Sequence, residues 1–349
     1  MTPRWLRSSG KRRSREPSAA ALDQVAELDA VAELDAVAEL DPVAGEAGLC
    51  DTARPMRVLP TSWLVVGASL LGLTPRISGA HEPPSPGPAA AHPSERPAGP
   101  HRPGVLLEEL AWPEAATVLN ADTVVVIPIG AAAKEHGPHL LLRNDFLLAE
   151  GLKQRILARA EVVVAPTVNY NFYPAFVEYP GSTTLRLETA RDLLIDICRS
   201  LARYGPRRFY ALNTGVSTLR ALQPAQEALA KEGIVLRYTD LLAALAPFEK
   251  QVLQQEGGTH ADESETSMML YLAPEAVDLK RAVKDFHPKR PGPFTRSPAG
   301  AGTYSPTGIW GDPTLATRQK GERLVTGLVQ AILDDLAALR RAELPPAHE

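Results

Sequence analysis

The sequence predicts a three-layer α/β/α sandwich built on a mostly parallel sheet. From residue 104 onward, short apolar runs rich in Val and Ile alternate with helix-like runs of about 10 to 18 residues. The strand-like runs comprise residues 123–127, 161–165, 208–212 and 234–238. Strands that alternate with helices in this way are typical of an α/β protein, in which helices cover both faces of a parallel sheet.

Helices are expected between these strands and after them. The first is expected at residues 106–117, where Pro113 and Glu114 stand near a helical start. The second, 144–158, begins at Asn144, a residue type that caps helix N-termini. The remaining helix-like runs are 187–204, 219–232, 263–272 and 324–343. Cys198 lies in an apolar part of the run 187–204, which predicts a buried and inert thiol.

Composition excludes several classes of protein. The 349 residues carry a formal net charge of −4, which gives no basic surface for nucleic acid. Two cysteines supply neither a disulfide framework nor a thiolate zinc site. Residues 105–349 read as one globular unit, large enough for a sizeable core.

The chain before residue 105 predicts three further segments. Residues 1–55 combine a basic start with leucines that recur every six residues. Six residues turn a helix by about 600°, so these leucines form no apolar stripe. We expect this stretch to be disordered, or to be a misassigned extension upstream of the true start. Residues 81–104 are expected to form a Pro-rich flexible linker.

Residues 56–80 resemble a secretory signal peptide. A short positive start after Met56 precedes an apolar run of about eleven residues and a small-residue site that ends at Ala80. The apolar run is too short for a comfortable membrane span, so no stable span is expected. We therefore expect translation from Met56 and a secreted or periplasmic protein. A single membrane anchor or an ordinary apolar patch is the alternative.

Histidines and carboxylates crowd the turn that follows the strand 123–127. This turn contains Lys134, Glu135, His136 and His139, and Asp145 follows it. Open α/β sheets place reactive groups at the carboxyl ends of their strands. Imidazole and carboxylate together are a ligand set for a divalent metal. The turn therefore predicts a metal site, with a solvated polar loop as the plain alternative.

Seven blocks in the same order resemble the creatininase (creatinine amidohydrolase) family over residues 105–330. The blocks are 107–112, 128–140, Asp145, 179–182, 213–215, 260–267, and 311–313 with 316–317. The resemblance implies hydrolysis of a C–N bond in a small-molecule amide, with zinc or manganese as cofactor. A bound metal would activate water and polarise the carbonyl group. The resemblance also implies a homo-oligomer, with a hexamer as the common assembly.

The resemblance assigns roles to individual residues. His136 matches a histidine ligand, Asp145 a bridging aspartate, and Glu265 is the candidate for a further carboxylate ligand. His260 matches a histidine that contacts substrate and donates a proton, with a capping or core histidine as the alternative. The other expected site residues are Lys134 and Glu135, as catalytic groups, and His139, Asn213, Tyr173 and Glu178, which would position ligands or contact substrate.

The chain departs from the family pattern at two ligand positions. Lys134 stands where the family has a glutamate ligand, two residues before His136. Gly215 stands where the family has a second histidine ligand. Both changes fall on the same metal, which predicts one ion per chain with the Lys134 ammonium beside it. The alternative is that Glu135 turns inward and restores a second ion.

The expected function is that of a metal-dependent amidohydrolase acting on a small cyclic or linear amide. One alternative is a catalytically weakened family member that binds a small ligand. Another is a peptidase for short peptides. The aromatic segment 169–178 could line a pocket for a flat or apolar ligand, although core packing explains such clusters more often.

Overall fold

The structure is a computed structural model that describes residues 103–347. The expected extension (1–55), the signal-peptide-like segment (56–80) and all but the last two residues of the expected linker (81–104) lie outside the described residues. Within the described part of the chain, no helix combines the length and the apolar character needed to cross a membrane.

A five-stranded parallel sheet forms the centre of the fold. Its strands, in the order β1-β3-β2-β4-β5, are β1 (Val105–Leu106), β3 (Val163–Val164), β2 (Val124–Ile129), β4 (Arg208–Asn213) and β5 (Val235–Tyr238). The central strands β2 and β4 pair along their whole length, and Ile129 is the register partner of Asn213. The chains that leave β2 and β4 therefore start side by side.

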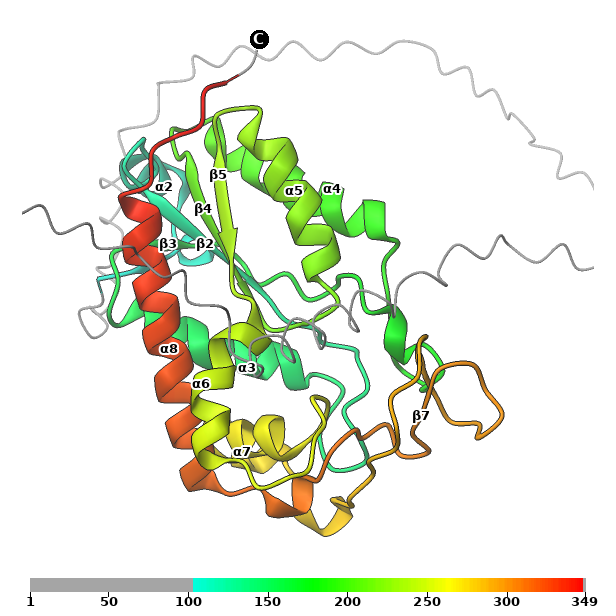
Figure 1. The fold of residues 1–349 in the computed structure, drawn as a ribbon. Helices are drawn as coiled ribbons and strands as arrows, with labels where there is room; N and C mark the ends of the chain where they lie inside the picture. Colours follow the sequence, from blue (N-terminus) through cyan, green and yellow to red (C-terminus); the bar gives the residue numbers. More distant parts are fainter. Residues whose placement is uncertain (1–102, 348–349) are drawn as a thin grey trace, which may run out of the picture. The chain divides into compact units, whose positions relative to one another are not determined.

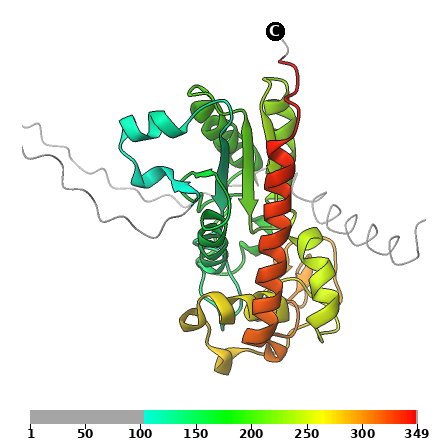
Figure 2. The same ribbon diagram turned by 90° about the vertical axis from the view of Figure 1, so that its left-hand side faces the viewer.

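Helices cover both faces of this sheet, which confirms the predicted three-layer fold. One face packs against α3 (Asn144–Leu157), α6 (Leu241–Val252), α7 (Glu263–Leu272) and α8 (Arg318–Arg340). The other packs against α2 (Trp112–Val118), α4 (Leu187–Ala202) and α5 (Leu219–Ala230). In Figure 1 the strands lie between α8, in red, and the pair α4 and α5, in green. Figure 2 shows α8 running alongside the strands.

The side chains of β2 show why the strand is apolar throughout. Val124 and Val126 pack into the core beneath α3 and α8, whereas Val125 and Ile127 pack into the core beneath α4 and α5. Successive side chains of a strand point to opposite faces, so a sheet covered on both sides needs apolar residues at every position. All six residues of β2 are buried.

Several predicted boundaries were wrong. The expected helix 106–117 begins only at Trp112, because Leu106 pairs with Val164 at the sheet edge and Pro113 occupies the first helical turn. Asn144 is the first residue of α3, not its cap; Arg143 precedes it. Helix α8 begins at Arg318, six residues before the predicted start at 324. The whole of α6 was missed.

The sheet's topology places a switch point where β2 and β4 meet. The helix after β2, α3, lies on one face, and the helix after β4, α5, lies on the other. Ligands of open α/β sheets bind at such a switch point, beyond the carboxyl ends of the strands. Two turns of 3-10 helix and a small sheet, β6 (Phe294–Thr295) paired with β7 (Thr303–Tyr304), belong to the segments around this edge.

Candidate active site

The turn after β2 carries the expected site residues into the interior. The backbone N–H of Lys134 donates to Leu142 O at 3.0 Å, and that of Glu135 donates to Ser182 Oγ at 2.9 Å. Gly137 adopts the left-handed conformation (φ 69°) that lets the chain double back. Lys134, Glu135 and His136 are consequently buried, although each is polar.

Asp145, in the first turn of α3, is fully buried and makes two charged contacts. Lys134 Nζ lies 2.8 Å from its Oδ2, and His136 Nε2 lies 2.7 Å from its Oδ1. Burial alone would raise the pKa of Asp145, but the two cationic neighbours outweigh it and hold the pKa well below its usual range. Asp145 therefore stays ionised, and Lys134 neutralises it as expected.

The hydrogen bonds of His136 define its protonation. Nδ1 lies 3.0 Å from the carbonyl oxygen of Lys134, a group that can only accept, so Nδ1 carries hydrogen. Nε2 then needs its own proton to donate to Asp145. Burial would lower the pKa of His136, but Asp145 overcomes this effect and the pKa is raised. A metal ion bound at Nε2 would replace that proton.

A second group of polar side chains comes from the start of α7. Asp262 caps this helix by accepting from the backbone N–H of Glu265 at 3.0 Å, and Ala261 before it adopts a left-handed conformation (φ 48°). A non-glycine residue in that region is strained, which is common at functional sites. The distortion sets His260 against the turn after β2, where its Nε2 lies 3.0 Å from Glu135 Oε2.

Three buried donors converge at this point. One ligand atom from each of His136, His260 and Glu265 lies within 4.8 Å of the other two. The remaining ring nitrogens are already held, His136 Nδ1 by a carbonyl oxygen and His260 Nε2 by Glu135. Metal-binding imidazoles are usually oriented in this way through their second nitrogen. Two imidazoles, one carboxylate and an open position suit zinc or manganese.

Aromatic rings enclose the other side of the site. The ammonium of Lys134 lies 4.9 Å from the centre of the Phe176 ring and 5.6 Å from that of Tyr173. Phe176 also contacts His260, with ring centres 4.2 Å apart, and stacks on Phe294 at 5.5 Å. Tyr173 and Phe176, from the segment 169–178, pack with Ala131 and Tyr179 in a small apolar core beside the site.

The structure places the remaining expected residues in different surroundings. His139 Nε2 contacts Thr266 Oγ1 at 2.8 Å, and burial lowers the pKa of His139 to about 4, so the ring is neutral. Asn213 uses its side chain on its own loop, donating to Gly215 O and accepting from Thr218 Oγ1. Glu178 is exposed and holds β6 by accepting from Thr295 and Arg296. Of the four residues expected to position ligands or contact substrate, Tyr173 is the one that lies beside Lys134.

Three residues near the site were not predicted. Phe294 lies in β6, 149 residues after Asp145, and stacks on Phe176. Ser182 fixes the backbone of Glu135, and Gly308 lies against the Glu135 carboxylate. A Cβ on Gly308 would stand 2.0 Å from Glu135 Oε1, and its φ of 84° also favours glycine. The segment that contains Gly308 therefore lies beside the site.

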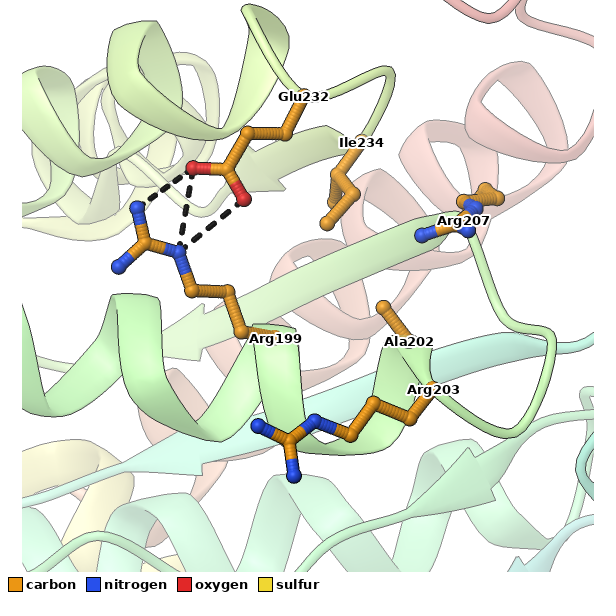
Figure 3. A pocket seen from close by; sticks show the side chains of 6 residues that line it. All are labelled: Arg199, Ala202, Arg203, Arg207, Glu232 and Ile234. Atoms are coloured by element: carbon orange, nitrogen blue, oxygen red, sulfur yellow. Dashed lines mark hydrogen bonds and ion pairs between the residues drawn. The ribbon is translucent and has the colours of Figure 1, made fainter. Parts of the chain in front are cut away.

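The surface hollow drawn in Figure 3 lies elsewhere, at the C-terminal end of α4. Its volume is about 240 Å³, and its lining includes Arg199, Arg203, Arg207 and Glu232. Arg199 and Glu232 bind one another at 2.6 Å. None of its lining residues belongs to the buried cluster described above, so the hollow gives no direct access to it.

Comparison with known proteins agrees with this geometry. The family described as creatinine amidohydrolase matches residues 108–336. Creatinine amidohydrolase of Pseudomonas putida is 31% identical over 263 residues, covering 69% of this chain and 98% of that protein. Mycofactocin precursor peptide peptidase of Mycolicibacterium smegmatis is 28% identical over 219 residues, covering 60% and 83%. A solved structure described as creatininase with Mn has a TM-score of 0.58 at 27% identity, covering 68% of this chain and 100% of its own. With the family match spanning well over half of its length, this chain belongs to the creatininase family.

Proposed function

We propose that this protein is a metal-dependent amidohydrolase that cleaves a C–N bond of a small cyclic or linear amide. Its relatives support the hydrolase class: they are named as a creatinine amidohydrolase, as peptidases of a peptide precursor, and as a 3-dehydro-scyllo-inosose hydrolase of Thermotoga maritima. The observation that carries the metal is the convergence of His136, His260 and Glu265 in the buried site.

One divalent ion, zinc or manganese, is proposed for each chain. Solved creatininases carry manganese or zinc, as their titles state. In this chain the three donors converge on one another, while the ammonium of Lys134 lies 2.8 Å from Asp145. A second divalent ion would have to share Asp145 with that ammonium, and two cations at one carboxylate repel each other. Asp145 stays a predicted ligand from the sequence; in this proposal it holds Lys134 and His136.

The chain's own residues then have distinct tasks. When bound, the ion would activate a water molecule. Glu135 orients His260 through the 3.0 Å contact and is itself fixed by the backbone N–H of Gly137. Because Glu135 is not one of the three donors, it is the buried carboxylate placed to take a proton from water and return it to the leaving nitrogen. The rings of Phe176 and Phe294 keep bulk water out.

Metal analysis of purified protein tests this proposal directly. We expect about one equivalent of zinc or manganese per wild-type chain after dialysis against the metal, and much less for Glu265→Gln. Glu178→Gln is the matched control, because Glu178 lies on the surface and its carboxylate binds only β6 and the residue after it. Two equivalents in the wild type would refute the one-ion version, and no metal in any variant would refute the metal site.

A catalytically weakened, ligand-binding protein is the second candidate. The closed contacts of Asp145 with Lys134 and His136 favour it, because both carboxylate oxygens are already engaged by neighbouring side chains where a reactive centre is expected. A panel of cyclic amides, linear amides and short peptides, each tested with and without chelator, separates the candidates. Hydrolysis that disappears with chelator supports the amidohydrolase, and cleavage limited to the peptides supports a peptidase. Binding without turnover supports the weakened protein.

We also propose that the mature protein is secreted or periplasmic and begins after Ala80, because residues 56–80 have the sequence pattern of a signal peptide. N-terminal sequencing of protein isolated from its natural source tests this. A native N-terminus upstream of Met56 would exclude both translation from Met56 and cleavage after Ala80.

A further inference from the structure

Tyr173 carries a buried hydroxyl group without a partner. Its side chain is 1% exposed, and its oxygen has no hydrogen-bond partner among the described residues. Buried hydroxyl groups are normally hydrogen-bonded, since burying one unpaired is costly. Tyr179, six residues later, shows the usual arrangement, because its hydroxyl donates to the carbonyl oxygen of Ser305 at 2.7 Å. An unpaired phenol beside a candidate active site calls for a ligand.

The neighbouring ammonium group of Lys134 also has unused hydrogen-bond donors. Lys134 Nζ contacts one acceptor among the described residues, Asp145 Oδ2, although an ammonium group carries three N–H donors. The rings of Tyr173 and Phe176 flank it within 6 Å, and they attract the charge without accepting a conventional hydrogen bond. The two unused donors and the phenol therefore belong to the same corner of the site.

Gly215 shows how the Tyr173 ring comes to occupy this corner. A Cβ built on Gly215 would lie 3.2 Å from Tyr173 Cε1, the ring atom next to the carbon that bears the hydroxyl. The same Cβ would lie 3.1 Å from Thr218 Oγ1. The hydroxyl-bearing end of the ring thus packs closely against the loop after β4 at a residue that lacks a side chain.

We propose that Tyr173 and Lys134 form a subsite for the carbonyl oxygen of a neutral substrate. An sp² oxygen has two acceptor positions and can receive one hydrogen bond from the phenol and one from the ammonium. A neutral group is favoured over an anion, because the Lys134 ammonium is already paired with the Asp145 carboxylate. Such donors stabilise negative charge that develops on the oxygen during attack.

This inference names the substrate group of the proposed hydrolase and so rests on that function, but its test measures binding and stability only. The probe is acetone, which offers a carbonyl oxygen and has no C–N bond to cleave; acetate has the same shape and a negative charge. Dissociation constants are obtained by NMR titration of full-length protein. The variants are Tyr173→Phe and the matched control Tyr179→Phe, both of which keep the aromatic ring.

We expect Tyr173→Phe to weaken acetone binding roughly 3- to 10-fold, the effect of one hydrogen bond, and Tyr179→Phe to leave it unchanged. We also expect acetate to bind more weakly than acetone. Acetone binding that is equal in the wild type and Tyr173→Phe would overturn the subsite, and stronger binding of acetate would overturn its preference for a neutral group. These outcomes do not depend on whether any amide is hydrolysed.

Thermal unfolding gives a second, independent test of the unpaired hydroxyl. Removing it in Tyr173→Phe deletes an unsatisfied polar atom, so the Tm of the free protein should stay the same or rise. Tyr179→Phe breaks the bond to Ser305 and should lower the Tm. An equal fall in Tm for both variants would show that the Tyr173 hydroxyl is bound inside the protein, which would overturn the proposal.

Discussion

Replacing Lys134 by methionine should destabilise the protein strongly. The ammonium of Lys134 lies 2.8 Å from Asp145, and the two side chains are 6% and 0% exposed. Two unit charges at that distance attract each other by about 6 kcal/mol at an effective dielectric constant of about 20. Methionine keeps the apolar stem against Phe176 but leaves Asp145 with only one cationic neighbour. Breaking a buried pair from one side costs about 3 to 5 kcal/mol, and we expect a loss in that range.

Urea unfolding at pH 7 in the presence of chelator measures this loss. Lys153→Met is the matched control: Lys153 is equally buried, but its partner Glu150, at 2.7 Å, is 29% exposed, so a loss of about 1 kcal/mol or less is expected. Adding Asp145→Asn to Lys134→Met removes the stranded charge and should recover part of the loss, giving a coupling energy of about 1 to 3 kcal/mol. A Lys134→Met variant no less stable than Lys153→Met would refute the reasoning.

Three further predictions concern other parts of the molecule. His139 has a folded pKa of about 4 against 6.5 for the free side chain, so between these values the unfolded chain binds the extra proton. The free energy of unfolding should therefore fall as the pH drops through this window, by about 2 kcal/mol at pH 5. In urea titrations at several pH values, His139→Gln should show a smaller fall than the wild type. Parallel pH profiles for the two proteins would contradict this. Gly308→Ala places a methyl group on the Glu135 carboxylate and a side chain at positive φ, so a loss of at least about 1 to 2 kcal/mol and of hydrolysis is expected in unfolding and activity assays. Arg199→Ala removes a half-exposed ion pair with Glu232, so the free energy of unfolding should change by no more than about 0.5 kcal/mol. A larger change would show that this surface ion pair stabilises the fold more than its exposure predicts.

The regular part of the fold could be predicted because its signals are local. The strand at 124–129 is a continuous run of buried apolar residues, and helix 263–272 begins behind a capping aspartate. Helix α6 was missed although its internal Pro247 has a counterpart in Pro224 of α5, which was predicted, so proline alone does not account for the omission. The first helix was predicted too long because Leu106 is apolar for a different reason: it pairs with β3 at the edge of the sheet.

The candidate site could be predicted only where its residues follow one another in the chain. Lys134, His136 and Asp145 share one strand-to-helix connection, so their proximity follows from the strand end. The contact of Phe294 with Phe176 joins two loops that carry no periodic pattern, and it depends on how the segment around β6 folds back over the site. Likewise, the sequence alone could not indicate that His260 turns its ring toward Glu135.

Tyr173 contacts both Lys134 and Gly215, which are 81 residues apart in sequence. Substitutions at these three positions are therefore coupled. A histidine introduced at 215 would meet the phenol ring, and a glutamate introduced at 134 would face Asp145 with His136 as the remaining cationic neighbour. Each single reversal is therefore unfavourable while the other residues remain, and the three positions have to change together. Because of this epistasis, the combination of Lys134, Tyr173 and Gly215 should be difficult to reverse by single substitutions in evolution, whatever reaction the site serves.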